Sequence, residues 1–519
     1  MATTLRIRDL PERYNVCEIL DRNLEGGRSD KVAIRWGEEE VTYGELAART
    51  HAMAAALREA GVRREERVLL ILDDSPAWPT AFLGSVRIGA VPVPVSFLDN
   101  PQNFVHYLRD SYARVVVVES AVADKLEAVL GEVPGDHEVW SANGEVPGAT
   151  PLEELLDGHA GEEVATVDTH RDDMAFWLYS SGSTGRPKGV VHLHHDIPYT
   201  CQTYGREIIE IEEDDVTFSS TKLYHAYGMG NNFSFPYSVG ASTVLLSGPP
   251  NPKAILETAQ RHRPTLFFSV PTIYNAMLNL PDAGEHDLSS VRRCASAAEP
   301  LSPTVLGRWR DVFGLDILDG IGSTEMLHIY CSNRADHIVP GTSGDAVPGY
   351  ELKLLDEDGR EVPRGEVGNL LVRGDSAHAF YWHQHEKTKA TVRGDWFFTG
   401  DRYRRDEAGG YVYEGRADDM IKVGGLWVSP IEVENTLAEH PLVIEAAVVG
   451  VRAEETTRVK AYLVCREHDR TEDDLSAELQ QWCKDRLRRY EYPHFFDFVE
   501  DLPKTLTGKI QRYKLREPS

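Results

Sequence analysis

The sequence has little of several features that would place a chain in a special class of protein. Its six cysteines among 519 residues show no Cys-x-x-Cys spacing, which argues against a zinc site and against a framework of disulfides. No apolar run approaches the roughly 20 residues needed to cross a bilayer, and the N-terminal residues lack the apolar centre of a secretory signal. These absences predict a cytoplasmic protein without a membrane anchor.

Positive charge is scarce as well. Lys and Arg number 55 against 83 Asp and Glu, so the net charge is −28. Such an acidic chain is repelled by nucleic acid and by anionic membranes, and we expect neither as its main partner. Any phosphate-bearing ligand must be held locally, by backbone N–H groups, a metal ion and a few placed cations.

The length predicts two or more domains. Short apolar runs, such as the one around Leu70, alternate with amphipathic stretches, as is typical of βαβ units. From Gly341 to Asp401 the pattern changes to strand-like pieces with Gly and Pro turns. We therefore predict an α/β fold: residues 1–417 form a large N-terminal domain of helix-covered sheets plus a β-rich subdomain, and residues 418–519 form a small α+β C-terminal domain.

Two local predictions can be checked directly. Residues 133–148 are polar and rich in Gly and Pro, which favours a surface loop. Residues 474–490 carry Leu475, Leu479, Trp482 and Leu487 at roughly helical spacing, which predicts one amphipathic helix.

The clearest chemical signal is the segment SSGSTGRPKG, which follows an apolar, strand-like run. Its glycines allow the backbone to present successive N–H donors, its hydroxyls add further donors, and its lysine adds a charge, which suits a polyphosphate. In the frame of a Walker loop, however, Pro187 precedes the lysine and Gly189 follows it, so the magnesium-binding hydroxyl is missing. The candidate phosphate-binding residues are Ser180, Ser181, Gly182, Ser183, Thr184, Gly185 and Lys188.

This segment resembles the phosphate loop of the adenylate-forming superfamily of acyl-CoA synthetases, carrier-loading adenylation domains and luciferases. Four further segments resemble the later motifs of that superfamily, in the same order: DGIGSTEM, FTGD, GRADDMIKVGGLWVSPIEVE and PKTLTGKIQR. Together the five motifs span essentially the whole chain. The resemblance implies an enzyme that activates a carboxylic acid as an acyl adenylate, with ATP, Mg²⁺ and coenzyme A as cofactors.

The resemblance also implies roles for single residues. Attack of a carboxylate on the α-phosphate brings two anions together, so the site has to screen charge. By likeness Glu325 would hold Mg²⁺, Thr324 would bond the α-phosphate, and Lys509 would bridge the acyl carboxylate and the α-phosphate. Asp401 would accept both ribose hydroxyls beside Arg416. The other nucleotide-binding candidates are Asp319, Gly320, Ile321 and Lys422.

The superfamily alternates between two domain arrangements. Lys509 belongs to the predicted small domain and the phosphate loop to the large one, so a closed arrangement has to unite them. The resemblance implies that the small domain is mobile and turns about a hinge at Asp418. The turn would present Gly424, Gly425 and Trp427 to the thiol, because glycines let a thin pantetheine arm approach the backbone.

Several stretches are most similar to benzoate and hydroxybenzoate CoA ligases, including KLYHAYGMGN and LDGIGSTEMLHI. That likeness implies an aryl or bulky cyclic acid, with His225 at the gate between nucleotide and thiol tunnel. One departure is SAAEP, where those ligases usually have glycine in place of Ala298, and an added methyl group can reshape a pocket. The substrate-binding candidates are Ala226, Tyr227, Ala298, Gly322, His328 and Ile329, and each is also open to a plain packing role.

Several alternatives remain open at this stage. The acid can be a bulkier alicyclic one, as in secondary metabolism. The enzyme can favour the thioester-forming half-reaction on a supplied acyl adenylate, or it can load a carrier protein instead of CoA. A non-catalytic nucleotide-binding scaffold is disfavoured because the charged motif residues are intact. No acidic residue in KLYHAYG is available to pair an α-amino group, and HLHH lacks further ligands at metal-binding spacing. A homodimer is compatible with the superfamily.

Overall fold

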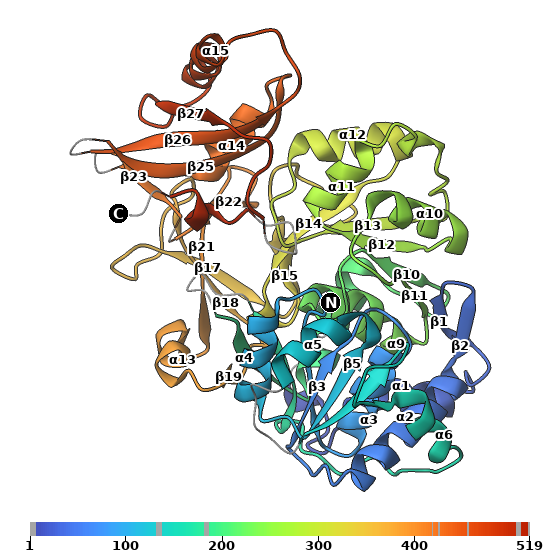
Figure 1. The fold of residues 1–519 in the computed structure, drawn as a ribbon. Coiled ribbons are helices and arrows are strands. Elements are labelled where there is room, and N and C mark those ends of the chain that lie inside the picture. The colour runs from blue at the N-terminus through green and yellow to red at the C-terminus, as the bar shows by residue number, and fades with distance from the viewer. Residues whose placement is uncertain are drawn as a thin grey trace.

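The structure is a computed structural model that describes residues 7–130, 137–180, 186–417, 419–423, 426–453, 456–504 and 510–516. Figure 1 shows a large lobe of sheets and helices, a group of strands at its side, and a small lobe formed by the C-terminal residues. The predicted α/β fold is confirmed. Among the described residues, no helix is both long and apolar enough to cross a membrane.

A sheet of nine described strands forms one half of the large lobe, in the order β16-β15-β14-β13-β12-β10-β11-β1-β2. Its central strands from β14 to β1 run parallel, whereas β2, β15 and β16 are antiparallel additions at the two ends. The strands are β1 (Val32–Trp36), β2 (Glu39–Thr42), β10 (Val216–Ser219), β11 (Ser242–Leu245), β12 (Leu266–Ser269), β13 (Arg293–Ser296), β14 (Ile317–Gly322), β15 (Ile329–Ser332) and β16 (Asp345–Ala346).

Three helices pack beside this sheet: α10 (Pro252–His262), α11 (Pro271–Leu278) and α12 (Pro303–Phe313) (Figure 1). All three begin with proline at the first turn, where a missing N–H costs nothing. Their apolar faces meet the sheet through Phe267, Tyr274 and Trp309, whose rings lie 4.7 to 6.2 Å apart. Burial on both faces explains why β12 reads as a continuous apolar run.

A second sheet is parallel throughout, in the order β4-β3-β5-β6-β7. The loop predicted over residues 133–148 is wrong in its centre, because β6 lies there and Trp140 is 1% exposed. Pairing with the buried strand β5 overrides the polar composition of its flanks. The strands are β3 (Arg67–Ile71), β4 (Val91–Pro94), β5 (Val115–Glu119), β6 (Glu138–Ala142) and β7 (Thr150–Pro151), and nearby helices are α2 (Tyr43–Glu59), α3 (Ala77–Arg87), α4 (Pro101–Ser111), α5 (Ala123–Leu130) and α6 (Leu152–Gly158).

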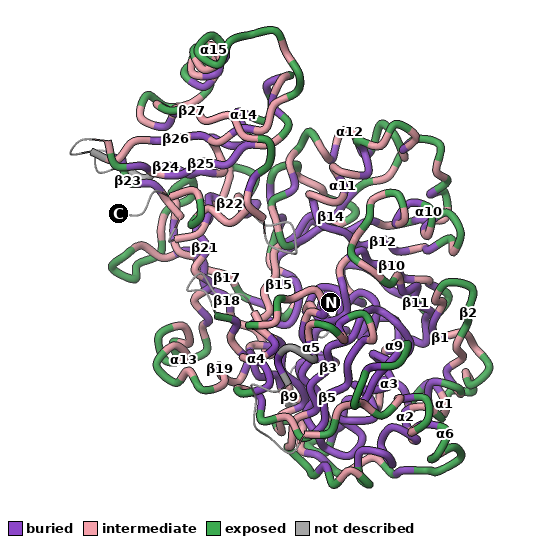
Figure 2. Tube along the Cα trace, viewed as in Figure 1, coloured by how far each residue is buried: buried purple, intermediate pink, exposed green. Residues whose placement is uncertain are grey.

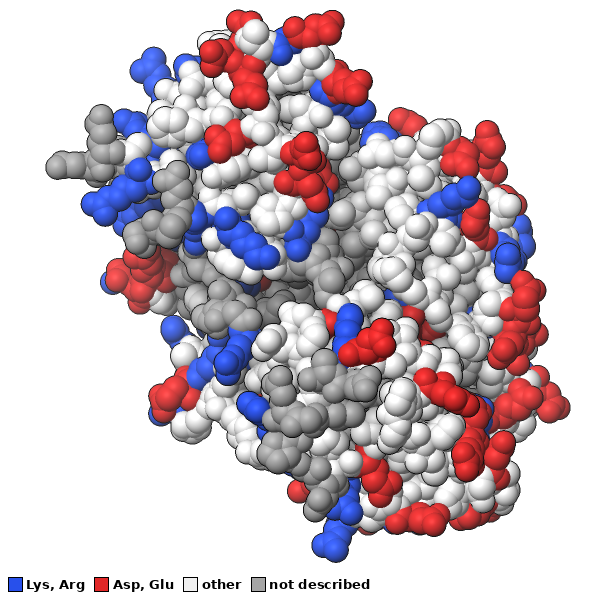
Figure 3. Space-filling view, viewed as in Figure 1, with Lys and Arg blue, Asp and Glu red and all other residues white. Residues whose placement is uncertain are grey.

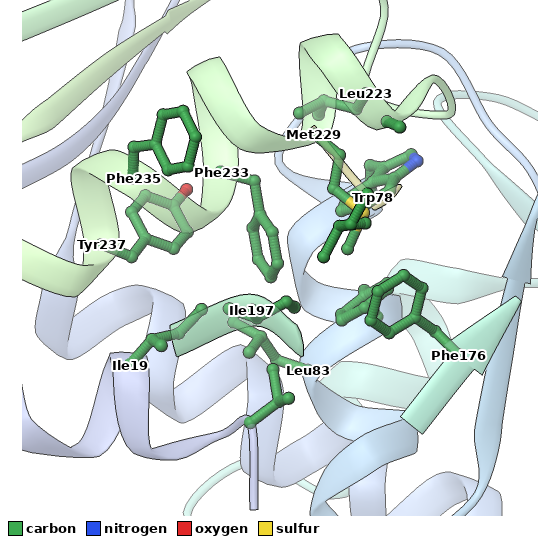
Figure 4. Close-up of a cluster of buried hydrophobic side chains, with 14 of the residues drawn as sticks. Ile19, Trp78, Leu83, Phe176, Ile197, Leu223, Met229, Phe233, Phe235 and Tyr237 are labelled. Carbon is green, nitrogen blue, oxygen red and sulfur yellow. The ribbon is translucent and has the colours of Figure 1, made fainter. Parts of the chain in front are cut away.

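An aromatic core joins the two halves of the large lobe (Figure 4). Trp78 stacks on Phe82 with ring centroids 5.1 Å apart, and Phe82 contacts Phe176 and Phe233 at 5.5 and 5.0 Å. The small sheet β19-β9-β8 supplies Phe176. Figure 2 shows that buried segments run through the middle of the large lobe. The elements around this core include α1 (Glu18–Glu25), β8 (Met174–Ser180), β9 (Lys188–Leu193), α7 (Asp196–Thr200), the π-helical turns η3 (Cys201–Ile209) and η4 (Gly230–Ser234), α8 (Ala226–Met229), α9 (Phe235–Val239) and β19 (Phe380–Tyr381).

The predicted β-rich subdomain is present as an antiparallel sheet, β17-β18-β21-β20, with β22 paired to β21. The C-terminal lobe combines the hairpin β23-β24, the sheet β25-β26-β27 and two helices. The elements are β17 (Glu351–Leu355), β18 (Gly368–Arg373), α13 (His385–Thr391), β20 (Val392–Arg393), β21 (Trp396–Arg405), β22 (Tyr411–Arg416), β23 (Ile421–Val423), β24 (Leu426–Val428), α14 (Pro430–Ala438), β25 (Val443–Ala453), β26 (Thr456–Cys465), α15 (Glu472–Lys484) and β27 (Phe495–Phe498).

The helix predicted over residues 474–490 is too long, since α15 ends at Lys484. Leu487 lies in the turn that follows, where its N–H donates to the carbonyl of Cys483 at 2.8 Å. The turn still packs Leu487 against the core of the lobe. The position of Leu487 in the sequence therefore matches that of a residue in a further helical turn. On the face drawn in Figure 3, acidic side chains line the outer margin of the large lobe and many of the basic ones lie over the C-terminal lobe.

Candidate nucleotide and acyl site

The predicted phosphate loop joins two adjacent antiparallel strands. Ser180, at the end of β8, pairs with Lys188, at the start of β9, while residues Ser181 to Gly185 lie outside the described residues. The next residue, Gly189, has little room for a side chain, because a Cβ there would lie 3.2 Å from the Cβ of Trp382. The sheet thus fixes where the lysine of the loop emerges.

Lys188 contacts Glu325 across the site. Its Nζ lies 2.7 Å from Oε1 of Glu325, and the same oxygen accepts a hydrogen bond from the Tyr381 hydroxyl at 2.9 Å. The ammonium also lies 4.0 Å from the centre of the Tyr381 ring. Burial acts to raise the pKa of Glu325, but the ammonium of Lys188 outweighs it and lowers that pKa to about 2. Glu325 is therefore an ionised carboxylate at neutral pH.

Sequence reasoning missed Tyr381, because no motif marks it. A single buried carboxylate beside a phosphate loop suits Mg²⁺, which takes one or two carboxylates together with substrate phosphates and waters. Glu325 fits that role, and the described residues hold no cluster of three or more His, Cys, Asp or Glu side chains that would serve another metal.

Thr324 lies beside Glu325 in a short 3₁₀ turn (Thr324–Met326). Its carbonyl accepts from Nε2 of His192 at 2.8 Å, and Nδ1 of His192 contacts Asp196 at 2.6 Å. His192 is fully buried. The HLHH segment therefore contributes a clamp on the Thr324 backbone rather than a metal site among the described residues.

Asp401 and Arg416 form the predicted ribose-binding pair. They are direct partners on β21 and β22, and Nη1 of Arg416 lies 3.0 Å from Oδ1 of Asp401. The N–H of Asp401 donates to the hydroxyl of Thr399 at 3.0 Å, which fixes the turn. The two residues thus meet as the motif predicts.

The segment DGIG lies where β14 meets β15. A Cβ on Gly320 would lie 2.8 Å from the carbonyl oxygen of Cys331, and one on Gly322 would lie 2.4 Å from that of His328. Close strand pairing therefore requires these glycines whatever else they bind, and Ile321 lies between them. Asp319 precedes them, and burial raises the pKa of its carboxyl to about 8.

Of the acyl-pocket candidates, Tyr227 and Gly322 lie against His328. Its ring centroid lies 5.4 Å from that of Tyr227, and its Nε2 lies 3.2 Å from Oδ1 of Asn231. Burial lowers the pKa of His328 to about 3, so the ring is neutral. Tyr204 and Phe235, at 4.9 and 4.6 Å, complete the wall and were not found from sequence. Ile329 is buried on β15, Ala226 opens α8, and His225 lies just before it.

Several predicted residues stay predictions. Asp418, Gly424, Gly425 and Lys509 lie outside the described residues, as does the side chain of Trp427. Lys422 is exposed on β23. At the base of the Lys509 segment, Lys504 and Ile510 form a β-bridge and the N–H of Gln511 donates to the carbonyl of Pro503 at 2.8 Å. The described residues on either side of the Lys509 segment are thus joined by hydrogen bonds.

Ala298 has φ +75°, a left-handed conformation that favours glycine. Its side chain is exposed, so its cost in this structure is conformational rather than steric. We expect Ala298→Gly to raise the free energy of unfolding by about 0.5–1 kcal/mol, measured by urea denaturation. Ala297→Gly changes the buried neighbour and should lower the free energy of unfolding. If Ala298→Gly and Ala297→Gly lower it equally, the backbone of Ala298 is not strained.

A buried ionic network supports the loop before α8, and sequence reasoning missed it. Nζ of Lys222 lies 2.8 Å from Oδ1 of Asp73 and donates to the carbonyl of Leu246 at 2.5 Å. The N–H of Leu223 donates to Oδ1 of Asp74 at 2.9 Å. These bonds fix the segment that leads to His225 against the ends of β3 and β11.

The network predicts a pH-dependent stability. Burial raises the pKa of Asp74 to about 6, although Lys222 and the N–H of Leu223 favour the ionised form. The native state therefore holds the proton of Asp74 more tightly than the unfolded chain does. The protonated carboxyl thus contributes to the free energy of unfolding at pH 4, and this contribution is lost as the pH rises through 6. Asp74→Asn keeps the oxygen acceptor, and we expect it to stabilise the protein at pH 8 by up to about 3 kcal/mol. Urea midpoints should show this gain shrinking at pH 5; a gain independent of pH would contradict it.

Comparisons with known proteins find similarity along nearly the whole chain. The family described as AMP-binding enzyme matches residues 20–382, and the AMP-binding enzyme C-terminal domain matches residues 432–509. A benzoate–CoA ligase of Thauera aromatica is 45% identical over 511 residues, covering 98% of this chain and 96% of the relative. A 4-hydroxybenzoate–CoA/benzoate–CoA ligase of Rhodopseudomonas palustris is 40% identical over 510 residues, covering 97% and 94%.

Solved structures show the same relationship. A crystal structure of an anthranilate CoA ligase in complex with anthranoyl-AMP matches with a TM-score of 0.94 and 40% identity, covering 98% of each chain. A benzoate CoA ligase from Burkholderia xenovorans matches with a TM-score of 0.90 and 43% identity, covering 97% of this chain and 100% of the other. The resemblance found in the sequence is thereby confirmed over the full length.

Proposed function

Because the chain belongs to the AMP-binding enzyme family, we propose that it is an AMP-forming acyl-CoA synthetase that joins an aryl carboxylic acid to coenzyme A. The observation that carries the proposal is the buried contact of Lys188 with Glu325 at the exit of the phosphate loop. It brings a cation for phosphate and a carboxylate for Mg²⁺ to one place. Full-length similarity to benzoate CoA ligases supports an aromatic acid.

The first half-reaction forms the acyl adenylate. A carboxylate oxygen of the acid attacks the α-phosphorus of ATP, the bond to the bridging oxygen breaks, and pyrophosphate leaves with the electron pair. In this proposal Lys188 and Thr324 bind the phosphates, and Asp401 holds the ribose. Mg²⁺ held at Glu325 supplies charge neutralisation when bound. Lys509 would neutralise the two reacting anions, which is worth several kcal/mol in a water-poor site.

The second half-reaction forms the thioester. The CoA sulfur attacks the acyl carbon, the bond from that carbon to the phosphate oxygen breaks, AMP leaves with the electron pair, and the thiol proton passes to solvent. We propose that the small lobe turns about Asp418 between the steps and brings Gly424, Gly425 and Trp427 to the thiol. The proposed domain boundary at 417/418 falls between β22 and β23.

The neutral ring of His328 and the aromatic wall beside it suit a flat, uncharged ring in the acyl pocket. The partners are therefore the acid, ATP and CoA, with a carrier protein less favoured and a homodimer allowed.

None of the six cysteines, all within the described residues, forms a disulfide, which suits a reducing cytoplasm.

A panel of benzoate, hydroxybenzoates, aminobenzoates and cyclohexane carboxylates tests the proposal. We expect release of pyrophosphate that depends on the acid, followed by formation of the CoA thioester. Absence of pyrophosphate release with every acid would overturn the adenylation role. Transfer to a phosphopantetheinylated carrier with no CoA product would favour a carrier-loading enzyme instead.

A further inference from the structure

One buried histidine beside Glu325 has no role in the site described so far. His378 lies in the connection between β18 and β19 and is 4% exposed. Its backbone N–H donates to the carbonyl of Glu325 at 2.7 Å, which holds the residue against the candidate magnesium ligand. Its ring lies 4.5 Å from the ring of Tyr381 and 5.4 Å from that of Phe397.

Neither ring nitrogen of His378 has a hydrogen-bond partner among the described protein atoms. A buried polar atom left unsatisfied costs about 1–3 kcal/mol. The neutral imidazole, whose pKa burial lowers to about 4, offers one N–H donor and one acceptor. His192, by contrast, uses both of its nitrogens within the protein.

The surroundings of His378 indicate what would satisfy it. The charged groups that act on the ring are Glu325, Lys188 and Asp196, with His192 beside them. Oε1 of Glu325 already accepts from Lys188 and Tyr381, and Asp196 is engaged by His192. Among the described residues neither carboxylate is hydrogen-bonded to the His378 ring, so a polar group that enters with the ligand would satisfy it. Mg²⁺ usually keeps several of its waters when it binds a carboxylate and phosphates, and these waters are strong donors.

We propose that His378 binds the water shell of the Mg²⁺·ATP complex at Glu325, with its unprotonated nitrogen accepting from a metal-bound water. The inference rests on the proposed nucleotide site and adds a metal-dependent contact to it. Alternatively, the ring N–H can donate to a phosphate oxygen of ATP. The contact with a metal-bound water requires Mg²⁺, whereas the contact with phosphate does not. Simple packing against Tyr381 and Phe397 is the reading to be excluded.

Calorimetric titration of the full-length protein with ATP, in Mg²⁺ and in EDTA, tests the proposal. His378→Phe keeps the ring and removes both nitrogens; we expect it to weaken ATP binding in Mg²⁺ about tenfold and to leave metal-free binding unchanged. His378→Gln, which retains a donor and an acceptor, should recover part of the loss. His440→Phe is the matched control, because His440 is also 4% exposed but lies in the C-terminal lobe, and it should not change either affinity.

Three results would overturn the inference. Unchanged affinity of His378→Phe in Mg²⁺ would make the residue a packing element, and equal weakening with and without the metal would assign the contact to phosphate. If His378→Phe fails to fold, folded His378→Gln and His378→Ala take its place. If both of these variants bind ATP as tightly as the unaltered protein, in EDTA and in Mg²⁺, the inference is also rejected. Failure of the unaltered protein to bind ATP at all would instead reject the proposed function.

Discussion

Replacing Glu325 by glutamine should lower the rate of acid-dependent adenylation by about 100-fold or more. The amide keeps the size of the side chain and removes the charge that Lys188 and Tyr381 now contact at 2.7 and 2.9 Å. It also removes the only charge that this side chain offers to a metal. Pyrophosphate release at saturating acid and ATP, measured across a range of Mg²⁺ concentrations, checks the result.

The same variant should require much more Mg²⁺ for half-maximal rate, because the lost group is the proposed ligand. Glu445→Gln is a suitable control, since Glu445 also pairs with a lysine, Lys504, at 2.7 Å but lies on β25 in the C-terminal lobe. An unchanged Mg²⁺ requirement in Glu325→Gln would remove Glu325 from the metal site.

The second large effect is expected at Lys509. Lys509→Ala should reduce formation of the acyl adenylate by about 100-fold or more, because the variant lacks the cation that neutralises the reacting anions. Thioester formation from supplied acyl-AMP should stay within a few-fold of the unaltered enzyme. Pyrophosphate release and CoA-thioester formation, measured separately, report the two half-reactions.

Lys504→Ala provides the matched control for Lys509, since both lysines belong to the segment PKTLTGK. Lys504 pairs with Glu445 and Asp501 within its own lobe, so its loss should lower stability slightly and leave adenylation nearly unchanged. Equal loss of both half-reactions in Lys509→Ala would indicate a folding defect rather than the proposed role.

Most of the overall fold could be predicted from local pattern. Alternating apolar runs and amphipathic stretches indicated helix-covered sheets, and the change of texture after Gly341 indicated the β-rich subdomain. The prediction failed at β6, which is surrounded by polar residues, and at the end of α15. In both cases a tertiary contact decided the outcome: pairing with β5 in the first, and packing of Leu487 from a turn in the second.

The candidate site divides in the same way. The residues of the motifs, among them Lys188, Glu325 and Asp401, could be chosen from sequence because their segments resemble the motifs of a known superfamily. Tyr381 and His378 carry no such mark. Tyr381 lies on β19, which pairs with β9, and it contacts the carboxylate of Glu325, 56 positions earlier in the chain. His378 precedes β19 and donates its N–H to the carbonyl of Glu325.

By itself, then, the sequence determined the family and the order of its motifs, since these depend on residue types at short spacing. Only the tertiary structure decided which charges meet, that Ala298 adopts a left-handed backbone, and that the ring nitrogens of buried His378 find no hydrogen-bond partner among the described protein atoms. The physical reason is that burial and pairing depend on segments far apart in the chain. Their costs, such as an unsatisfied imidazole, do not exist until those segments pack together.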